Sequence, residues 1–534
     1  MKVEGAALPH PSRPLPELIS EGLGTKPDSI AIVSATDSLT WKELDEASSS
    51  LAAAYLSLGL EPGDRLASLM PNRIALAIHY LACFKAGLVI TPLNYRYTHR
   101  EIDHALSVSG ASALVAHVER AEDLAASEMV PGLPIGVIAF GADEQAESNQ
   151  GEPPDPLFGR LPAFEELIAA EIDGFLPAEP SSDDPAAVFF TSGSTGPAKG
   201  VTHTNETIRW MIASAVAAFE ISPDDVFLPG SSMSHIGSFL WTLSALDAGA
   251  KIVLARTFDS HEILPLLREH QPTVMAMIPA ALSALINDHD LDPRDLSCLK
   301  ICRSGADSVS TELLAEFAEK AGFPIDEGYG MTEVGLATLN PPYGEIRQGS
   351  IGPPVPGFQI EIRGEDGAVA GPGEVGKVWI KSRSRMAGYW QAADATGEVV
   401  IDDWLDSGDL AHADEDGYIW FFGRKKQVIV HDGSNISPLE VEESLLEHPA
   451  VDLSGVVGIH DPVHGENVRA YVTIHSESEA PTAAELIRFS RDRVGYKAPE
   501  EVVILEEMPL NPTGKIDRAG LKEMAEKHLN PHHA

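Results

Sequence analysis

The chain has little cysteine and little positive charge. Its 534 residues contain three cysteines, Cys83, Cys298 and Cys302, too few for a disulfide framework and typical of a reducing compartment. The spacing of Cys298 and Cys302 could put both thiols on one helix face, but no histidine and cysteine cluster accompanies them, so we expect no structural zinc. Lysine and arginine number 38 against 80 aspartates and glutamates, a formal net charge of −42, which disfavours nucleic acid and anionic lipid as partners.

Long apolar runs are also missing. No stretch of about 18 apolar residues occurs, so no membrane span is expected, and the proline-broken N-terminus has no signal-peptide core. Hydrophobic residues still make up 44% of the chain, enough for a large interior. A chain of this length exceeds what a single core usually serves, which predicts two or more domains. We expect a cytoplasmic protein with no integral membrane association, for which a homodimer is one permitted assembly.

Helical and strand patterns alternate in the first part of the chain. Trp41–Leu58 has apolar residues at helical spacing, Asp64–Leu69 looks like a strand, Ile74–Ala86 is helical, and Leu88–Ile90 is a short buried strand. Val188–Phe190 is another apolar run of strand length. Alternation of this kind predicts an α/β fold with parallel sheets flanked by helices.

The pattern changes further along the chain. Residues 141–156 are acidic and without periodicity, which predicts a connector. Short alternating strands with glycine turns at 358–381 indicate a small barrel-like sheet. After a basic boundary at 424–426, helices are expected at 438–447 and 483–494. We therefore predict a large N-terminal domain, residues 1–423, a hinge at 424–426 and a small mobile α+β C-terminal domain, residues 427–534.

The most informative segment reads FTSGSTGPAKGV, from Phe190 to Val201. Glycines let backbone N–H groups turn toward an anion, hydroxyls add short donors, and Lys199 adds a cation, so the loop suits phosphate oxygens. Its spacing differs from that of a P-loop, because a glycine rather than a hydroxyl residue follows the lysine. Taken alone, such a stretch is more often a plain surface loop. The candidate phosphate-binding residues are Thr191, Ser192, Gly193, Ser194, Thr195, Gly196 and Lys199.

Four more segments offer parts of a nucleotide site. Gly328–Glu333 combines two glycines with a tyrosine ring, a hydroxyl and a carboxylate of the type that Mg²⁺ takes. Ser407–Asp409 is a polar turn with a carboxylate able to hold sugar hydroxyls. Gly423–Lys426 is a basic patch in an acidic chain, and Pro512–Arg518 is a rigid turn that presents Lys515.

These five segments, in this order, resemble the adenylate-forming (AMP-binding) superfamily of acyl-CoA synthetases, firefly luciferase and peptide-synthetase adenylation domains. The resemblance runs from Leu39, where LTWKELD is similar to an early motif of the family, to Arg518, and so covers most of the chain. It implies a ligase that uses ATP, Mg²⁺ and coenzyme A.

The resemblance also implies roles for single residues. The loop from Thr191 to Lys199 would hold the β- and γ-phosphates of ATP, and His235 would lie beside the acyl carboxylate. Lys515 would bridge that carboxylate and the α-phosphate, and Lys426 would be the hinge for domain rotation. The other implied contacts are adenine with Ser304, Gly305, Ala306 and Tyr329, flanked by Gly330 and Met331; the α-phosphate with Thr332; Mg²⁺ with Glu333; ribose with Asp409 and Arg424; and the thiol-transfer face with Gly433, beside which Asp432 replaces a glycine common in CoA ligases.

The role implied for Lys515 agrees with elementary electrostatics. A carboxylate that attacks the α-phosphorus is repelled by the negative phosphate oxygens, so the catalyst needs cations rather than a base. Lys515 and Mg²⁺ would supply that charge, and pyrophosphate would leave.

The motifs fit four functions to different degrees. An AMP-forming carboxylic acid–CoA ligase uses all of them. A peptide-synthetase-type enzyme needs a carboxylate just after His235, and residues 230–241 contain no aspartate or glutamate. A luciferase-like oxidative enzyme stays open, whereas a non-catalytic nucleotide-binding module would not need Lys515, Glu333 and Asp409. We predict the CoA ligase, with a stand-alone adenylation enzyme that passes the acyl group to a carrier protein or another acceptor as the alternative.

The acid is predicted from the stretches expected to wall its pocket. They are mostly small and apolar, with Met275, Met277 and Met331 as adaptable fillers. None contains a lysine or arginine for a second carboxylate, although Arg303 adjoins one of them. We expect a monocarboxylic acid with a medium-chain, alicyclic or aromatic body. The stretches are residues 235–239, 275–280, 304–306 and 330–336.

Overall fold

The computed structural model describes residues 1–8, 10–11, 13–141, 158–170, 174–191, 198–305, 309, 311–431, 434–461, 465–475, 480–511 and 514–529. The predicted connector at 141–156 lies outside this part of the chain apart from Gly141. Within it, no helix is long and apolar enough to cross a membrane.

The first sheet has seven strands in the order β18-β9-β8-β5-β4-β6-β7. The five strands from β8 to β7 pair in parallel, and β9 and β18 extend the sheet in antiparallel fashion. The strands are β4 (Arg65–Leu69), β5 (Val89–Pro92), β6 (Ala113–His117), β7 (Gly136–Phe140), β8 (Pro185–Thr191), β9 (Lys199–Thr204) and β18 (Gly388–Tyr389).

The second sheet has eight strands in the order β15-β14-β13-β12-β10-β11-β2-β3. All neighbours from β14 to β2 are parallel, and β15 and β3 close the two edges as antiparallel strands. The strands are β2 (Ile30–Val33), β3 (Ser38–Thr40), β10 (Val226–Gly230), β11 (Lys251–Val253), β12 (Val274–Met277), β13 (Ile301–Ser304), β14 (Asp326–Met331) and β15 (Gly335–Leu339).

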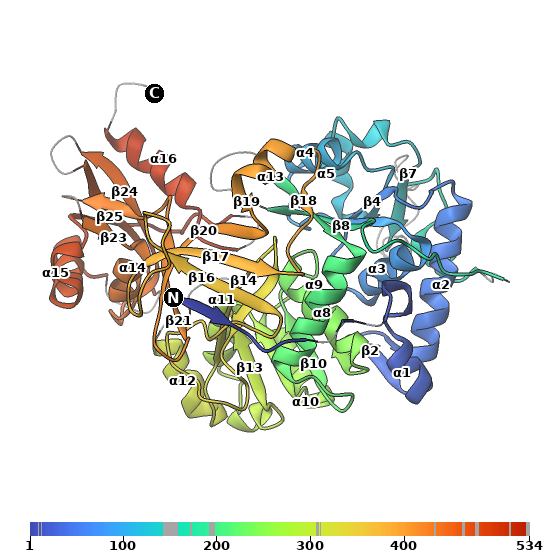
Figure 1. Cartoon of the computed structure of the whole chain (residues 1–534), viewed down its shortest axis with the longest axis horizontal. Helices are drawn as coiled ribbons and strands as arrows, with labels where there is room; N and C mark the ends of the chain where they lie inside the picture. Colours follow the sequence, from blue (N-terminus) through green and yellow to red (C-terminus); the bar gives the residue numbers. More distant parts are fainter. Residues whose placement is uncertain are drawn as a thin grey trace.

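Helices cover both faces of these two sheets (Figure 1). One core cluster joins the sheets through the helices between them, α2, α3, α8 and α9. A second cluster packs α10, α11 and α12 on the other face of the second sheet, and a third packs α4 and α5 on the first. The bounds are α2 (Trp41–Ser57), α3 (Ile74–Ala86), α4 (His99–Ser109), α5 (Ala121–Ala126), α8 (Asn205–Phe219), α9 (Ile236–Asp247), α10 (Ser260–His270), α11 (Pro279–Ile286) and α12 (Thr311–Ala321).

Local sequence explains why these helices begin and end as they do. Thr40 and Glu43 form a capping box at the start of α2, each side chain binding a backbone N–H of the other residue. Helix α3 is buried along its whole length, as its nearly continuous apolar sequence predicts, and it ends at Gly87 in the left-handed conformation. Its single lysine, Lys85, is neutralised by Asp45, whose Oδ1 lies 2.6 Å from Nζ.

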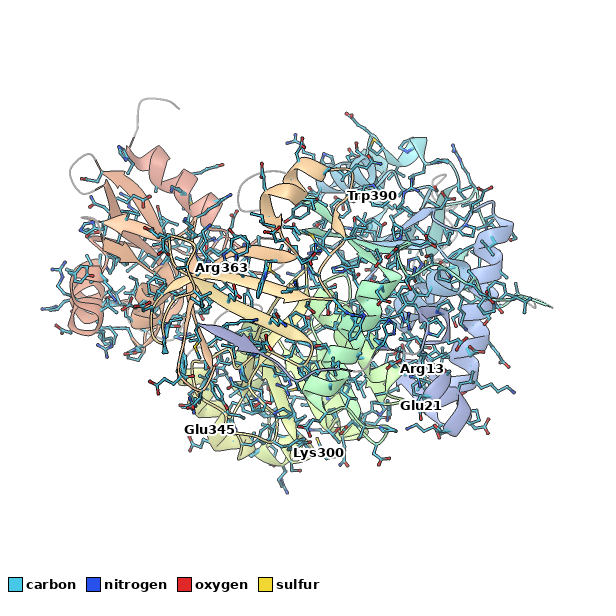
Figure 2. All side chains as sticks on the ribbon, in the orientation of Figure 1. Arg13, Glu21, Lys300, Glu345, Arg363 and Trp390 are labelled. Atoms are coloured by element: carbon cyan, nitrogen blue, oxygen red, sulfur yellow. The ribbon has the colours of Figure 1, made fainter. Side chains whose placement is uncertain are left out.

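A six-stranded antiparallel sheet follows, in which β21 pairs with β20 beside the path β1-β16-β17-β20-β19. This sheet confirms the short antiparallel strands expected around 358–381, although its strand order is an open path and not a closed barrel. In Figure 2, Arg363 lies on it; its guanidinium stacks over the rings of Trp379 and Trp404, at 4.4 and 5.1 Å from their centroids. The strands are β1 (Lys2–Glu4), β16 (Phe358–Arg363), β17 (Gly376–Ser382), β19 (Val400–Ile401), β20 (Trp404–Ala413) and β21 (Ile419–Arg424).

Arg13 is one of the residues that tie the N-terminal segment to the helical layer. Arg13 donates to Asp247 at the end of α9 at 2.8 Å and to Glu21 at 3.1 Å (Figure 2). The shorter elements in this part of the chain are α1 (Ser20–Thr25), α7 (Phe164–Ile168), α13 (Ala393–Val399) and the 3-10 helices Leu15–Glu17, Val118–Arg120, Val130–Gly132 and Pro293–Leu296.

The C-terminal part, orange to red in Figure 1, has its own five-stranded sheet and its own core clusters. The predicted helix at 483–494 is found with these bounds, and the one at 438–447 ends one residue earlier. The elements are β22 (Ile429–His431), β23 (Ser434–Ile436), β24 (Val451–Asp461), β25 (Gly465–Ile474), β26 (Glu501–Ile504), α14 (Pro438–Leu446), α15 (Ala483–Val494), α16 (Arg518–Leu529) and the 3-10 helix Gly495–Lys497.

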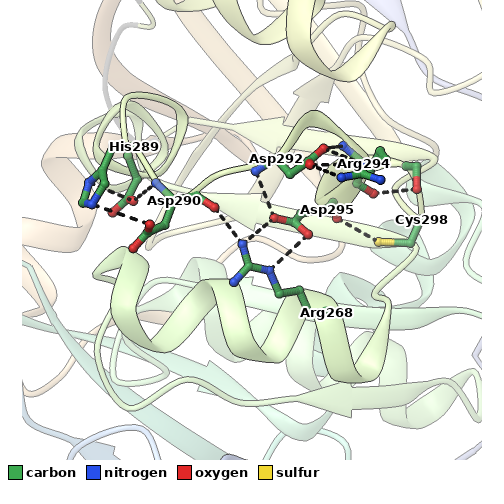
Figure 3. Close-up of polar contacts among 9 residues, drawn as sticks. Arg268, His289, Asp290, Asp292, Arg294, Asp295 and Cys298 are labelled. Atoms are coloured by element: carbon green, nitrogen blue, oxygen red, sulfur yellow. Dashed lines mark hydrogen bonds and ion pairs between the residues drawn. The ribbon is translucent and has the colours of Figure 1, made fainter.

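The structure decides the placement of two cysteines whose spacing allowed a shared helix face. Cys298 and Cys302 do not share a helix face, because Cys298 follows the 3-10 helix Pro293–Leu296 whereas Cys302 lies inside β13. Figure 3 shows the Cys298 thiol directed at the carbonyl of Asp295, 3.5 Å away, next to the ion pair of Asp295 with Arg268. All three cysteines are free.

Candidate active site

A cavity of about 3270 Å³ opens between the two large sheets, the antiparallel sheet and the C-terminal part of the chain. Every sequence-predicted site residue that the structure describes lines it. These residues are Thr191, Lys199, His235, Ser304, Gly305, Tyr329, Gly330, Met331, Thr332, Glu333, Asp409, Arg424, Lys426 and Lys515. The others, Ser192, Gly193, Ser194, Thr195, Gly196, Ala306 and Gly433, lie outside the described residues.

The two ends of the predicted phosphate loop lie side by side. Thr191 ends β8, Lys199 begins β9, and the two residues are cross-strand partners. The Lys199 ammonium lies 4.8 Å from the ring centroid of Tyr389, whose hydroxyl donates to Oε1 of Glu333 at 3.0 Å. The loop is therefore anchored next to the predicted metal-binding carboxylate.

Glu333 is the candidate metal ligand, and it is almost fully buried. Glu333 lies in the turn between β14 and β15. Burial raises the pKa of its carboxyl group. Among described residues, the one group of three or more metal-ligating side chains with clustered ligand atoms is Asp288, His289 and Asp290, which lies in the loop shown in Figure 3 and not in the cavity. A single buried carboxylate is the donor set that suits Mg²⁺ when phosphates and water supply the remaining ligands.

Asp409 and Tyr329 form the predicted nucleoside end of the cavity. The Tyr329 hydroxyl donates to Oδ2 of Asp409 at 2.6 Å. Arg424 on β21 is the cross-strand partner of Asp409, and its Nε lies 3.6 Å from Oδ1 of Asp409. Burial raises the pKa of Asp409, while Tyr329, Arg424 and Lys515 act in the opposite direction. The Tyr329 ring lies 6.0 Å from that of Phe421 and lines the cavity.

His235 precedes α9 and is held by a residue that sequence reasoning missed. Nδ2 of Asn94 lies 3.2 Å from Nε2 of His235. Burial, together with the charge of Lys515, lowers the pKa of His235 to about 4, so the ring is neutral at neutral pH. An amide nitrogen can only donate, which leaves the ring proton on Nδ1. The signal for Asn94 was its place just after β5, at the carboxyl end of a parallel strand.

Lys515 reaches the cavity from the C-terminal part of the chain. A turn closes between Asn511 and Lys515. The Asn511 N–H donates to the Lys515 carbonyl at 2.7 Å, and the Asn511 side chain accepts from the Lys515 N–H at 3.1 Å. The charge of Lys515 acts on both His235 and Asp409. The turn therefore brings a cation to the cavity, close enough for its charge to act on both the nucleoside end and the histidine.

Hydrogen bonds within the protein fix the surroundings of three further predicted residues, Thr332, Ser304 and Lys426. The Thr332 carbonyl accepts from Nε2 of His203 at 2.8 Å, and the Ser304 hydroxyl donates to the Met277 carbonyl at 3.0 Å. Lys426 lies in a turn after β21, in which the N–H groups of Gln427 and Val428 bond the Arg424 carbonyl.

The predicted walls of the acyl pocket need correction. Met275 and Met277 are fully buried against α10–α12 and do not line the cavity, because side chains alternate along β12 and these two face away from α9. Phe239 likewise belongs to the core between the sheets. Residues that sequence reasoning did not include take their place in the lining, namely Phe219, Leu240, Trp241 and Arg303.

Comparison with known proteins agrees with this geometry. Residues 20–390 match the family model described as AMP-binding enzyme, and residues 440–515 match its C-terminal domain. The chain is 31% identical to feruloyl-CoA synthase of Amycolatopsis sp over 511 residues, 93% of this chain and 98% of that protein. It is 29% identical to the fatty acid–[acyl-carrier-protein] ligase ScoC of Streptomyces coeruleorubidus, over 93% of this chain and 94% of the relative.

A solved structure agrees over the same length. The benzoate CoA ligase from Burkholderia xenovorans LB400 superposes with a TM-score of 0.84 at 27% identity, covering 96% of this chain and all of the other. The family models and the shared fold therefore cover both the N-terminal and the C-terminal part of the protein, and both parts line the cavity. The chain belongs to the AMP-binding enzyme family and is an adenylate-forming ligase of its acyl-CoA synthetase branch.

Proposed function

We propose that this enzyme joins a medium-chain, alicyclic or aromatic monocarboxylic acid to coenzyme A through an acyl-adenylate. The observation that carries the proposal is the placement of Lys515. Burial and, to a smaller extent, the charge of Lys515 lower the pKa of His235, and that charge also acts on Asp409, in one cavity that Glu333 also lines. A cation at that point faces the place where the carboxylate and the α-phosphate, two anions, have to meet.

In the first half-reaction, a carboxylate oxygen of the acid forms a bond to the α-phosphorus and the bond to pyrophosphate breaks. Lys515 would donate to the carboxylate and to an α-phosphate oxygen, and the Thr332 hydroxyl would donate to that phosphate. Glu333 would hold Mg²⁺, which neutralises charge on the phosphates. His235 is neutral and so can border the carboxylate without drawing it away from Lys515 into an ion pair.

In the second half-reaction, the CoA thiol attacks the acyl carbon and AMP leaves. We propose that Lys515 serves adenylation in this position and that the C-terminal domain rotates to remove it before the thiol enters. The proposed division is a domain of residues 1–423, a hinge at 424–426 and a mobile domain of residues 427–534. Support comes from the turn at Lys425–Gln427, which is followed by the separate C-terminal core.

The nature of the acid rests on the cavity wall and on the relatives. Phe219, Leu240 and Trp241 give the wall beside α9 an apolar character. The names of two similar proteins, a feruloyl-CoA synthase and a benzoate CoA ligase, refer to aromatic monocarboxylic acids. Both features favour an acid with one reacting carboxylate and a largely apolar body.

A carrier-protein thiol is the alternative acceptor. The carrier-protein ligase ScoC matches the chain over nearly its whole length, so overall similarity does not separate the two acceptors. The first half-reaction is the same in both cases, and only the thiol that displaces AMP differs.

The proposal is tested by a screen of acids with ATP. Exchange of labelled pyrophosphate into ATP reports adenylation, and AMP and thioester are followed separately after CoA is added. AMP and thioester in equal amounts are expected with monocarboxylic acids. AMP without thioester would overturn CoA as the acceptor, a dicarboxylate that reacts faster than every monocarboxylate would overturn the acid class, and no exchange with any acid would overturn the adenylation reaction.

A further inference from the structure

The wall of the acyl cavity contains a buried arginine. Arg303 is the third residue of β13, beside Asp326 on β14, and its side chain is 2% exposed while it lines the cavity. Its guanidinium carbon lies 4.6 Å from the ring centroid of Phe219, at the end of α8. Strand β13 thus directs a cation toward the layer of α8 and α9, labelled in Figure 1, where the ring of Phe219 lies over the guanidinium.

Only part of the guanidinium is satisfied. One terminal nitrogen, Nη1, lies 3.1 Å from Oδ2 of Asp326 and donates to the Asn340 carbonyl at 3.4 Å. The other terminal nitrogen, Nη2, and the inner nitrogen, Nε, are both buried and have no hydrogen-bond partner among the described residues. A buried charged donor without a partner costs several times what an ordinary hydrogen bond gains. A ligand oxygen in the cavity would remove that cost.

The local charge indicates which oxygen fits. Burial lowers the pKa of Arg303 to about 10 and raises that of Asp326 to about 6, so both groups are charged at neutral pH and neutralise each other. A second carboxylate at this point would meet a pair that is already balanced, next to Asp326 itself. A neutral acceptor needs only the free N–H groups and brings no uncompensated charge into the interior.

We propose that Arg303 selects acids that carry a neutral oxygen acceptor, a hydroxyl, ether or ketone, on an otherwise apolar body. This inference rests on the proposed function, because it assumes that this cavity holds the acyl group. It places Arg303 as a specificity-determining residue, which acts on the far part of the substrate and not on the reacting carboxylate.

The test compares matched acids that differ in one oxygen. The pairs are 3-(4-hydroxyphenyl)propanoate with 3-phenylpropanoate, 4-methoxycinnamate with cinnamate, and 8-hydroxyoctanoate with octanoate. We expect the wild-type enzyme to prefer the oxygenated member of at least one pair in kcat/KM for pyrophosphate release. In Arg303→Met that preference should fall about 10- to 100-fold, the range for a hydrogen bond from a charged donor.

Two further variants keep the result interpretable. Arg303→Met leaves Asp326 buried without its partner, so the double variant Arg303→Met/Asp326→Asn repeats the measurement without that charge. Arg469→Met is the matched control, because Arg469 is also a buried arginine, paired with Glu501, but lies in the C-terminal sheet outside the cavity lining. It should leave the preference between paired acids unchanged.

The outcomes separate the two proposals. Pyrophosphate release with no preference within any pair, or a preference that survives both Arg303 variants, would overturn the role of Arg303 and leave the adenylation reaction standing. Suberate that reacts faster than 8-hydroxyoctanoate would overturn the neutral acceptor. No pyrophosphate release with any acid would overturn the proposed function itself.

Discussion

Lys515 is the residue on which adenylation should depend most. Replacing it with alanine removes the cation from the meeting point of carboxylate and phosphate, so pyrophosphate exchange should fall by about 100- to 1000-fold, as when one stabilising donor is removed. Thioester formation from preformed acyl-adenylate should survive, because that step does not need the ammonium group. The two half-reactions are measured separately in the same preparation.

A matched control exists at an exposed lysine outside the cavity lining. Lys300, labelled in Figure 2, lies 3.6 Å from Asp225, and its side chain is 55% exposed. Lys300→Ala should change neither half-reaction, since a surface ion pair contributes little. Equal loss of both half-reactions in Lys515→Ala would instead identify Lys515 as a structural residue.

Glu327 should make stability depend on pH. Burial, with a contribution from the charge of Glu443, raises the pKa of Glu327 to about 7, although the Gly349 N–H donates to it. Between its ordinary pKa of 4.5 and about 7, the folded protein keeps a proton that the unfolded chain has lost, so this group destabilises the fold as pH rises through that window.

Glu327→Gln is expected to remove that dependence. The amide oxygen still accepts from Gly349, and nothing has to ionise, so the variant should be more stable than wild type at pH 8 by on the order of 1–2 kcal/mol. At pH 4 to 5 the two should be nearly equal. Urea unfolding at both pH values measures the difference, and a variant that is less stable at pH 8 would show that the carboxylate is needed in its charged form.

At the scale of elements, the turn from β14 to β15 positions Thr332 and Glu333. It is closed so tightly that a Cβ atom on Gly330 would lie 2.3 Å from the Gly335 carbonyl oxygen. Gly330→Ala should therefore open the turn and displace both proposed catalytic side chains, with a loss of about tenfold or more in adenylation. Pyrophosphate exchange, with ATP-induced thermal stabilisation as a second readout, measures the effect.

Gly397 provides the control substitution for this prediction. It lies within α13, where an added Cβ meets nothing within 4 Å. Gly397→Ala should keep full activity and gain up to about 1 kcal/mol of stability from higher helix propensity. If Gly330→Ala were equally harmless, the turn would have to be more adaptable than its packing indicates.

Element prediction succeeded where periodicity and burial agree. Helices α3 and α15 have the predicted bounds, because an apolar run in one case and an amphipathic pattern with a Thr482 cap in the other leave little choice. The error in the acyl pocket came from strand parity. Met275 and Met277 alternate with Ala276, and the sequence of β12 does not say which set faces α9 and which packs against α10–α12. Arg303 lies just outside the predicted wall, which begins one residue later at Ser304.

At the scale of the whole molecule, the net charge of −42 should act against the folded state. Salt screens this self-repulsion, because exposed charges that lie farther apart than one Debye length, about 10 Å at 0.1 M salt, interact only weakly. We expect the midpoint of thermal unfolding to rise by several degrees between about 0.05 and 0.5 M sodium chloride. Sucrose at equal osmolarity is the control, and an equal rise in sucrose, or a fall in salt, would contradict the electrostatic origin.

The amino-acid order alone determined the class of fold, the family and the identity of the candidate nucleotide-binding and catalytic residues that line the cavity. Short-range pattern carries that information, since glycine-rich turns, strand periods and motif order are local properties. Only the tertiary structure decided which side chains lie next to one another. Asn94 behind His235, Tyr389 on Glu333 and Arg303 in the acyl wall come from segments far apart in the sequence, and their contacts depend on long-range packing that no local pattern records.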